Sequence, residues 1–109
     1  MYVEFRTVST DAAEALRNYV ERRLRFSLSR FGDRAGRVSV TISRDNAGIF
    51  TCRIHTEILP FGEVSVRETD LDLFAVIDRA TGRLGRLFKR ELERVREARN
   101  TRESVRLAA

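Results

Sequence analysis

The sequence has very little cysteine, histidine or tryptophan. Its 109 residues include one cysteine, Cys52, one histidine, His55, and no tryptophan. A single cysteine cannot close a disulfide within the chain, and neither a zinc-finger pattern nor a CxxC pair is possible. No second metal ligand or nucleophile accompanies the histidine. We therefore expect no metal site and no cofactor.

Long apolar runs and phosphate-binding loops are absent as well. No apolar run approaches the length that spans a membrane, and the first residues, MYVEFRT, lack the charged and then apolar order of a secretory leader. We therefore expect a cytoplasmic protein with no membrane association. Neither GxGxxG nor the P-loop pattern occurs, and Gly82 and Gly85 fall too late in an expected helix to cradle a phosphate.

The residues that could carry catalysis have simpler structural explanations. His55 lies on the polar side of an alternating strand, and Cys52 lies on its apolar side, where a small buried hydrophobe is expected. Asp70 and Asp72 lie at the start of an expected helix, where the helix dipole favours negative charge and a carboxylate can cap free N–H groups. We therefore expect no catalytic residue, no enzyme activity and no small-molecule substrate.

Arginine is what the sequence has in excess. The 21 basic residues include one lysine and outnumber the 16 acidic residues, which gives a net charge of +5. A guanidinium group can donate two hydrogen bonds to one phosphate, so nucleic acid is a possible partner, as is an acidic surface. Hydrophobic residues make up 42% of the chain, which is enough for a single folded domain.

Hydrophobic periodicity predicts the element order β-α-β-β-β-α. The strands alternate between apolar and polar residues, and each helix has one apolar stripe. Such elements pack economically when both helices cover the same side of the sheet. We predict an α+β fold with a four-stranded mixed sheet, both helices on one face, and the first two strands parallel. The expected strands are residues 2–6, 37–44, 50–58 and 64–67. The expected helices are residues 11–31 and 70–99. We expect one domain of residues 1–99, followed by a frayed tail of residues 100–109.

The second helix carries apolar and basic residues on opposite sides. Its apolar stripe runs from Leu73 to Ala98. The stretch from Arg79 to Arg90 contains five positive residues and no acid, so like charges repel along the helix unless a negative partner relieves them. The first helix, with Asp11, or alternatively Thr10 or Ser9, as its cap, also has a basic outer side. We therefore predict one basic surface made by both helices, which would contact nucleic-acid phosphates without reading bases.

Three stretches of the sequence occur in an order and at a spacing that a known family shares. They are ALRNYVERRL from Ala15 to Leu24, GEVSVRET from Gly62 to Thr69, and DLFAVID from Asp72 to Asp78 followed by Arg83-Leu84, with Phe74 where the family has tyrosine. Together they resemble the ribosome hibernation-promoting factor family, also called ribosome-associated inhibitor A or sigma-54 modulation proteins. The resemblance covers residues 1 to about 97. It is to the short members, which lack the dimerising C-terminal domain.

The resemblance implies a protein that binds the small ribosomal subunit in the mRNA and tRNA channel and silences translation under stress or in stationary phase. Its mechanism would be steric, with phosphate contacts holding a rigid plug. The implied rRNA contacts are Arg22, Arg23, Arg83, Arg86, Lys89 and Arg90, and the helical wheel adds Arg25 and Arg79.

The sequence departs from the family pattern at several positions. Phe26 stands where a basic residue is usual, Thr7 where glycine is frequent, and Leu87 where glutamine is frequent. Glu91, Glu93 and Glu97 interrupt an end that is usually rich in lysine. These departures leave two alternatives open, a regulatory protein-interaction module of the same fold and a general binder of double-stranded RNA. The oligomeric state is also left open by the sequence.

Overall fold

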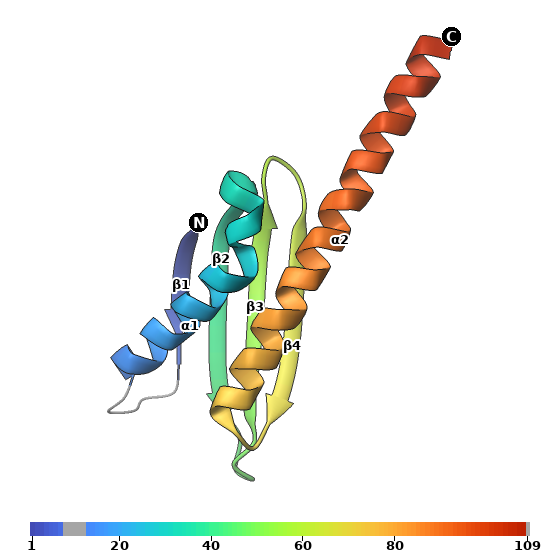
Figure 1. Ribbon diagram of the computed structural model, residues 1–109. Helices are drawn as coiled ribbons and strands as arrows, with labels where there is room; N and C mark the ends of the chain where they lie inside the picture. The colour runs from blue at the N-terminus through green and yellow to red at the C-terminus, as the bar shows by residue number, and fades with distance from the viewer. Residues whose placement is uncertain (8–12, 109) are drawn as a thin grey trace.

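The protein folds into two layers, a four-stranded sheet and a pair of helices (Figure 1). The computed structural model describes residues 1–7 and 13–108, and the side chains of residues 1–7 and 13–98. In chain order the elements are β1 (Tyr2–Arg6), α1 (Ala13–Leu28), the 3-10 helix η1 (Ser29–Arg34), β2 (Ala35–Arg44), β3 (Phe50–Ile58), β4 (Glu63–Asp70) and α2 (Leu73–Ala108).

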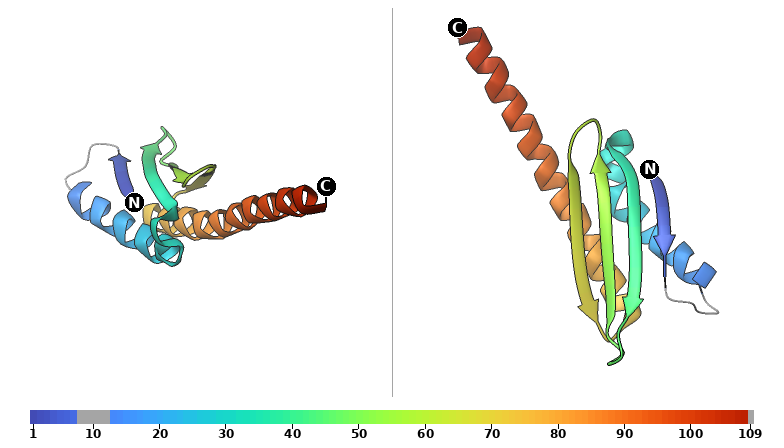
Figure 2. Two further views of the ribbon diagram at one scale, coloured as in Figure 1. Left: turned by 90° about the horizontal axis from the view of Figure 1, so that it is seen from above. Right: turned by 180° about the vertical axis from the view of Figure 1, so that it is seen from behind.

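The strands lie in the sheet in sequence order, β1-β2-β3-β4. β1 is parallel to β2, and the other two neighbouring pairs are antiparallel. Both helices lie on the same side of the sheet, and the opposite side is open (Figure 2). The predicted α+β class, mixed sheet and placement of both helices are therefore confirmed.

The alternation of side chains decides which face of each strand is buried. In β3, Cys52, Ile54 and Ile58 are buried under the helices, whereas Arg53 and Glu57 are exposed on the open face. β4 is longer than the predicted strand of residues 64–67. Two of its extra residues, Glu68 and Asp70, carry acidic side chains on the helix side, which a search for apolar alternation does not recognise.

The start of α2 confirms that Asp72 is a helix cap. Its Oδ1 accepts hydrogen bonds from the backbone N–H groups of Phe74, at 2.9 Å, and Ala75, at 3.1 Å. The Asp70 carboxylate in turn accepts from the N–H of Asp72 at 2.7 Å and so shapes the turn before the helix. The candidate caps of the first helix, Asp11, Thr10 and Ser9, lie outside the described residues.

The first helix ends earlier than expected. α1 stops at Leu28 instead of residue 31, and the chain tightens into η1, where Gly32 has a φ of +58°. The Phe31 ring still reaches the core, because it stacks on Phe88 with the ring centroids 4.5 Å apart. The apolar spacing therefore predicted the packing correctly and the end of the helix incorrectly.

α2 is longer than expected, since it continues as a helix to Ala108. Its C-terminal half projects beyond the sheet (Figure 1). Ala98 is therefore exposed, although the wheel placed it on the buried stripe. No change of secondary structure marks the expected boundary at residue 99, and fraying of residues 100–109 in solution stays a prediction. None of the helices in the described residues is long and apolar enough to cross a membrane.

Candidate nucleic-acid interface

The two helices lie side by side, so their outer sides form one continuous surface (Figures 1 and 2). Gly85 makes this close approach possible: a Cβ at this position would lie 3.0 Å from the backbone oxygen of Ser27. The Arg30 guanidinium donates a hydrogen bond to the Gly85 carbonyl at 3.2 Å. The cost of a glycine within α2 is therefore offset by the packing of α1 against it.

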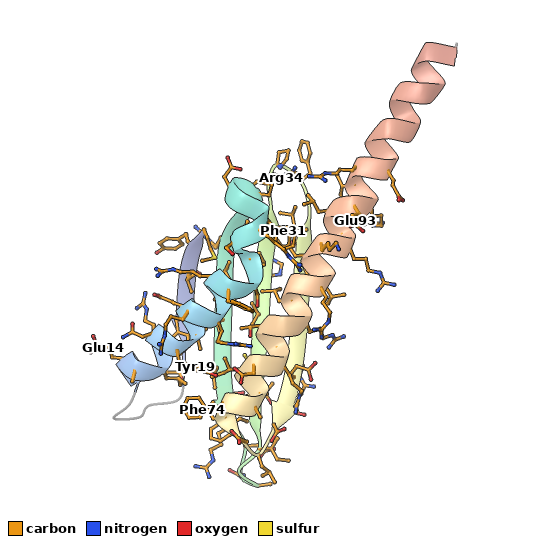
Figure 3. All side chains as sticks on the ribbon, viewed as in Figure 1. Glu14, Tyr19, Phe31, Arg34, Phe74 and Glu93 are labelled. Atoms are coloured by element: carbon orange, nitrogen blue, oxygen red, sulfur yellow. The ribbon has the colours of Figure 1, made fainter. Side chains whose placement is uncertain are left out.

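Asp78 joins the two helices at the other end of their contact. The Tyr19 hydroxyl donates a hydrogen bond to Asp78 Oδ1 at 2.5 Å, and this bond is the main cause of the raised pKa of Tyr19. The Nε atom of Arg23 lies 3.2 Å from the same oxygen. Tyr19 also packs edge-on against Phe74, with ring centroids 5.0 Å apart (Figure 3). Asp78 thus fixes the helices together and compensates the charge of Arg23.

Two of the predicted contact residues are paired with acids of β4. Arg79 lies 2.6 Å from the carboxylate of Asp70, donates to the Thr69 carbonyl at 2.5 Å, and lies 3.7 Å from Glu68. Arg83 lies 3.3 Å from Glu68. The pKa of Asp70 is lowered, first by the hydrogen bond from the Asp72 N–H and then by the bond from Arg79. The stretch without acids in the sequence therefore has acids beside it in the fold.

The other five predicted residues have no ion pair within the described part of the chain. All five side chains are exposed, but they do not all lie together. Arg25 lies beside Tyr2 and Val3 at the β1 edge, away from α2, so it does not extend the α2 stripe as the helical wheel suggested. The side chains that remain, which we call the cationic helix face, are Arg22 on α1 and Arg86, Lys89 and Arg90 on α2.

The structure adds neighbours that the sequence analysis did not include among the site residues. Lys89 lines a shallow hollow between η1 and α2 together with Arg30 and Arg34. Glu93 lines the same hollow (Figure 3), and its carboxylate lowers the net positive charge of the hollow. On α1, the Phe26 ring is 78% exposed, and the guanidinium carbon of Arg23 lies 5.7 Å from its centroid. The exposed ring is visible in the sequence only as a departure from the family pattern.

The residues considered for catalysis lie where the sequence placed them. His55 is on the open face of the sheet, with Nδ1 2.7 Å from the hydroxyl of Ser65. Cys52 is fully buried, and burial raises the pKa of its thiol to about 12. Within the described residues, no group of three histidine, cysteine or acidic side chains is arranged to hold a metal ion.

Most of the chain matches a known protein family. Residues 3–96 match the family described as sigma 54 modulation protein / S30EA ribosomal protein. The chain belongs to this family. Among solved structures it is similar to the N-terminal domain of Protein Y from Thermus thermophilus, with 32% identity, a TM-score of 0.70, and 83% of this chain and 98% of that chain covered.

A second solved structure shows the same fold at low identity. It is a ribosomal subunit interface protein from Coxiella burnetii, with 14% identity, a TM-score of 0.70, and coverage of 85% of this chain and 99% of that chain. No curated protein sequence matches the chain significantly. The S30EA family is one of ribosome-associated modulation proteins and is not an enzyme family.

The stretch from Asp72 to Asp78 has a structural role in this chain. Asp72 caps α2, Phe74 packs on Tyr19, and Asp78 holds Tyr19 and Arg23. Val76 and Ile77 of the same helix are fully buried in the core. The contacts of Phe74 and Asp78 with α1 therefore help to set how the two helices lie against each other.

Proposed function

We propose that this S30EA family member is a cytoplasmic, ribosome-binding translation inhibitor that occupies the mRNA and tRNA channel of the small subunit under stress or in stationary phase. The observation that carries the proposal is the cationic helix face, whose four exposed cations have no ion pair in the described part of the chain. Family membership and the likeness to a Protein Y domain support the ribosome as the partner.

The contacts would be made mainly to rRNA phosphates. Arg22, Arg86 and Arg90 each present a planar fork that can donate two hydrogen bonds to one phosphate, and Lys89 adds a point charge. Such contacts give affinity and fix position but carry no base specificity. The protein would then act as a rigid plug that excludes mRNA and tRNA by occupying their space, and no bond is made or broken.

The ion-paired arginines Arg23, Arg79 and Arg83 are weaker candidates for rRNA contacts. A phosphate that binds Arg79 or Arg83 competes with Glu68 and Asp70, which already accept from these side chains. Arg23 likewise is held by Asp78. We therefore rank these three below the cationic helix face as rRNA contacts, and we place Arg25 at a separate contact near β1.

Co-sedimentation with purified 30S subunits over a series of salt concentrations tests the proposal. Each phosphate contact contributes about 0.7–0.9 to the slope of log K against log salt. The variant Arg86→Gln/Lys89→Gln/Arg90→Gln should lower the slope by about 2–3 and weaken binding at low salt by at least ~10-fold. The matched control is Arg17→Gln/Arg37→Gln/Arg94→Gln, which removes the same charge from arginines paired with glutamates and should change little.

Two results would count against the proposal. Equal slopes for the two triple variants would mean that the cationic helix face is not the contact surface. Failure of the wild-type protein to enter 30S and 70S fractions would remove the ribosome as partner, and nuclease-resistant capture of one acidic protein would then favour the protein-interaction alternative. Binding of a plain RNA duplex as tightly as 30S would favour the general RNA binder.

A further inference from the structure

The open face of the sheet carries a second cationic surface that the helices do not share. Arg6 on β1, Arg53 on β3 and Arg67 on β4 fall in one row across the strands, with Thr41 of β2 completing it. The register pairs Arg6 with Thr41, Thr41 with Arg53, and Arg53 with Arg67. We call these three arginines the arginine row. Neither helix covers this face (Figure 2).

The arginine row has no internal compensation. All three side chains are exposed, and none forms an ion pair with another residue in the part of the chain that the structure describes. Arg53 and Arg67 are direct cross-strand neighbours, with Cα atoms about 5 Å apart, and like charges so placed destabilise a sheet. The unliganded fold therefore bears a repulsion that a bound anion would remove.

The acids of the open face lie away from Arg53 and Arg67. Glu57 and Glu63 are each four residues from the arginine of their own strand, which is about 13 Å along a strand. Glu63 lies 3.3 Å from His55, and Glu4 lies 3.7 Å from Arg37. Negative charge on the open face therefore lies at Glu4, beside Arg6 on β1, and toward the far ends of β3 and β4. Arg53 and Arg67, in contrast, have no acid as a direct cross-strand neighbour.

Hydroxyl groups surround the central pair of arginines. A shallow hollow on the open face is lined by Arg53 and Arg67 together with polar side chains that can donate hydrogen bonds. These neighbours are Ser39, Thr41, His55 and Ser65. A phosphate group accepts several hydrogen bonds at once and favours two guanidinium forks with hydroxyl donors nearby.

We propose that the arginine row is a second phosphate-binding site, which takes the phosphodiester backbone of an RNA segment other than the one bound by the cationic helix face. The identity of the ligand as RNA rests on the proposed function. A body lodged in an RNA channel has RNA on more than one side, and the two cationic surfaces lie on opposite sides of this molecule. The arginine row would therefore let the protein bridge two RNA segments.

The decisive experiment compares two double variants in the salt-dependent 30S binding assay. Arg53→Gln/Arg67→Gln should lower the slope of log K against log salt by about 1.4–1.8 and weaken binding roughly tenfold. The control Arg17→Gln/Arg37→Gln removes the same charge from ion-paired arginines, and one of them, Arg37, also lies on the open face. The Arg53→Gln/Arg67→Gln protein should melt at the same or a higher temperature than wild type, so lost binding would not reflect unfolding.

The outcome separates this inference from the proposed function. If both double variants have the same slope while the helix triple variant loses binding, the arginine row is not a ribosome contact and the proposed function stands. If the wild-type protein does not bind 30S, the proposed function fails, and NMR titration with an RNA duplex or with inorganic phosphate decides the site. Shifts at Arg53 and Arg67 with RNA support it, whereas shifts with phosphate alone, or none, overturn it.

Discussion

The two glycines of α2 give a sharp test of how the helices pack. Alanine at either position removes the conformational freedom of glycine and should stabilise an isolated helix by about 0.5–1 kcal/mol. The two sites differ in their surroundings. A Cβ at Gly82 meets only the flexible end of Arg86, at 3.6 Å, whereas a Cβ at Gly85 meets the backbone oxygen of Ser27, at 3.0 Å.

The expected free energies of unfolding follow from these distances. Gly82→Ala should gain most of the helix preference, about 0.5–1 kcal/mol. Gly85→Ala gains the same preference but must push α1 away, and overpacking of this kind costs typically about 1–3 kcal/mol. It also crowds the Arg30 guanidinium, which lies 3.7 Å from the new Cβ and bonds the Gly85 carbonyl. Gly85→Ala should therefore be less stable than Gly82→Ala by roughly 1–3 kcal/mol.

Thermal and urea unfolding of the two variants measure this difference directly. For a domain of this size, 1 kcal/mol corresponds to about 4–8 °C in Tm, so the two melting temperatures should be well separated, with wild type between them or close to Gly85→Ala. If Gly85→Ala were as stabilising as Gly82→Ala, α1 would not lie against α2 as described. The joined outer surface of the helices would then lose its geometric basis.

Two further predictions concern titratable groups. Because the folded-state pKa of Asp70 is lowered, its ionisation stabilises the fold above the unfolded-state pKa of about 3.9, and this contribution is lost as the pH falls through the folded-state value. Asp70→Asn should therefore flatten the pH dependence of stability below about pH 4, as measured by urea unfolding between pH 2 and 7, and an unchanged profile would contradict the contacts of Asp70. Burial raises the pKa of the Cys52 thiol to about 12. The native protein at pH 8 should therefore react with a maleimide far more slowly than the urea-unfolded chain, and equal rates would show that Cys52 is accessible.

The strands and the layer arrangement could be predicted because one face of every strand is buried. Alternation with a period of two residues is strong wherever a sheet has one covered side, as in β3. Prediction from alternation fails at the end of β4, where Glu68 and Asp70 occupy the helix side and continue the strand with polar residues. Pairing with arginines of α2 replaces apolar burial there, and the strand continues beyond the predicted end.

The candidate site was harder to predict, because charge compensation depends on three-dimensional neighbours. Arg79 and Arg83 lie in an acid-free stretch of the helix, yet their partners come from β4, nine to fifteen residues earlier in the chain. Asp78 compensates Arg23 across 55 residues of sequence. A helical wheel cannot show such contacts, nor can it show that Arg25 lies toward β1. It did place Arg22, Arg86, Lys89 and Arg90 on exposed sides.

The alternation in β4 assigns consecutive charged residues to different tasks. Arg67 lies on the open side of the sheet, while its neighbour Glu68 lies on the helix side and pairs with Arg83 of α2. Each surface can therefore change by substitution at its own set of positions, without altering the other. An insertion of one residue would exchange the two sets at once. Binding at the helix side and binding at the open side of the sheet can thus change independently while the fold stays the same.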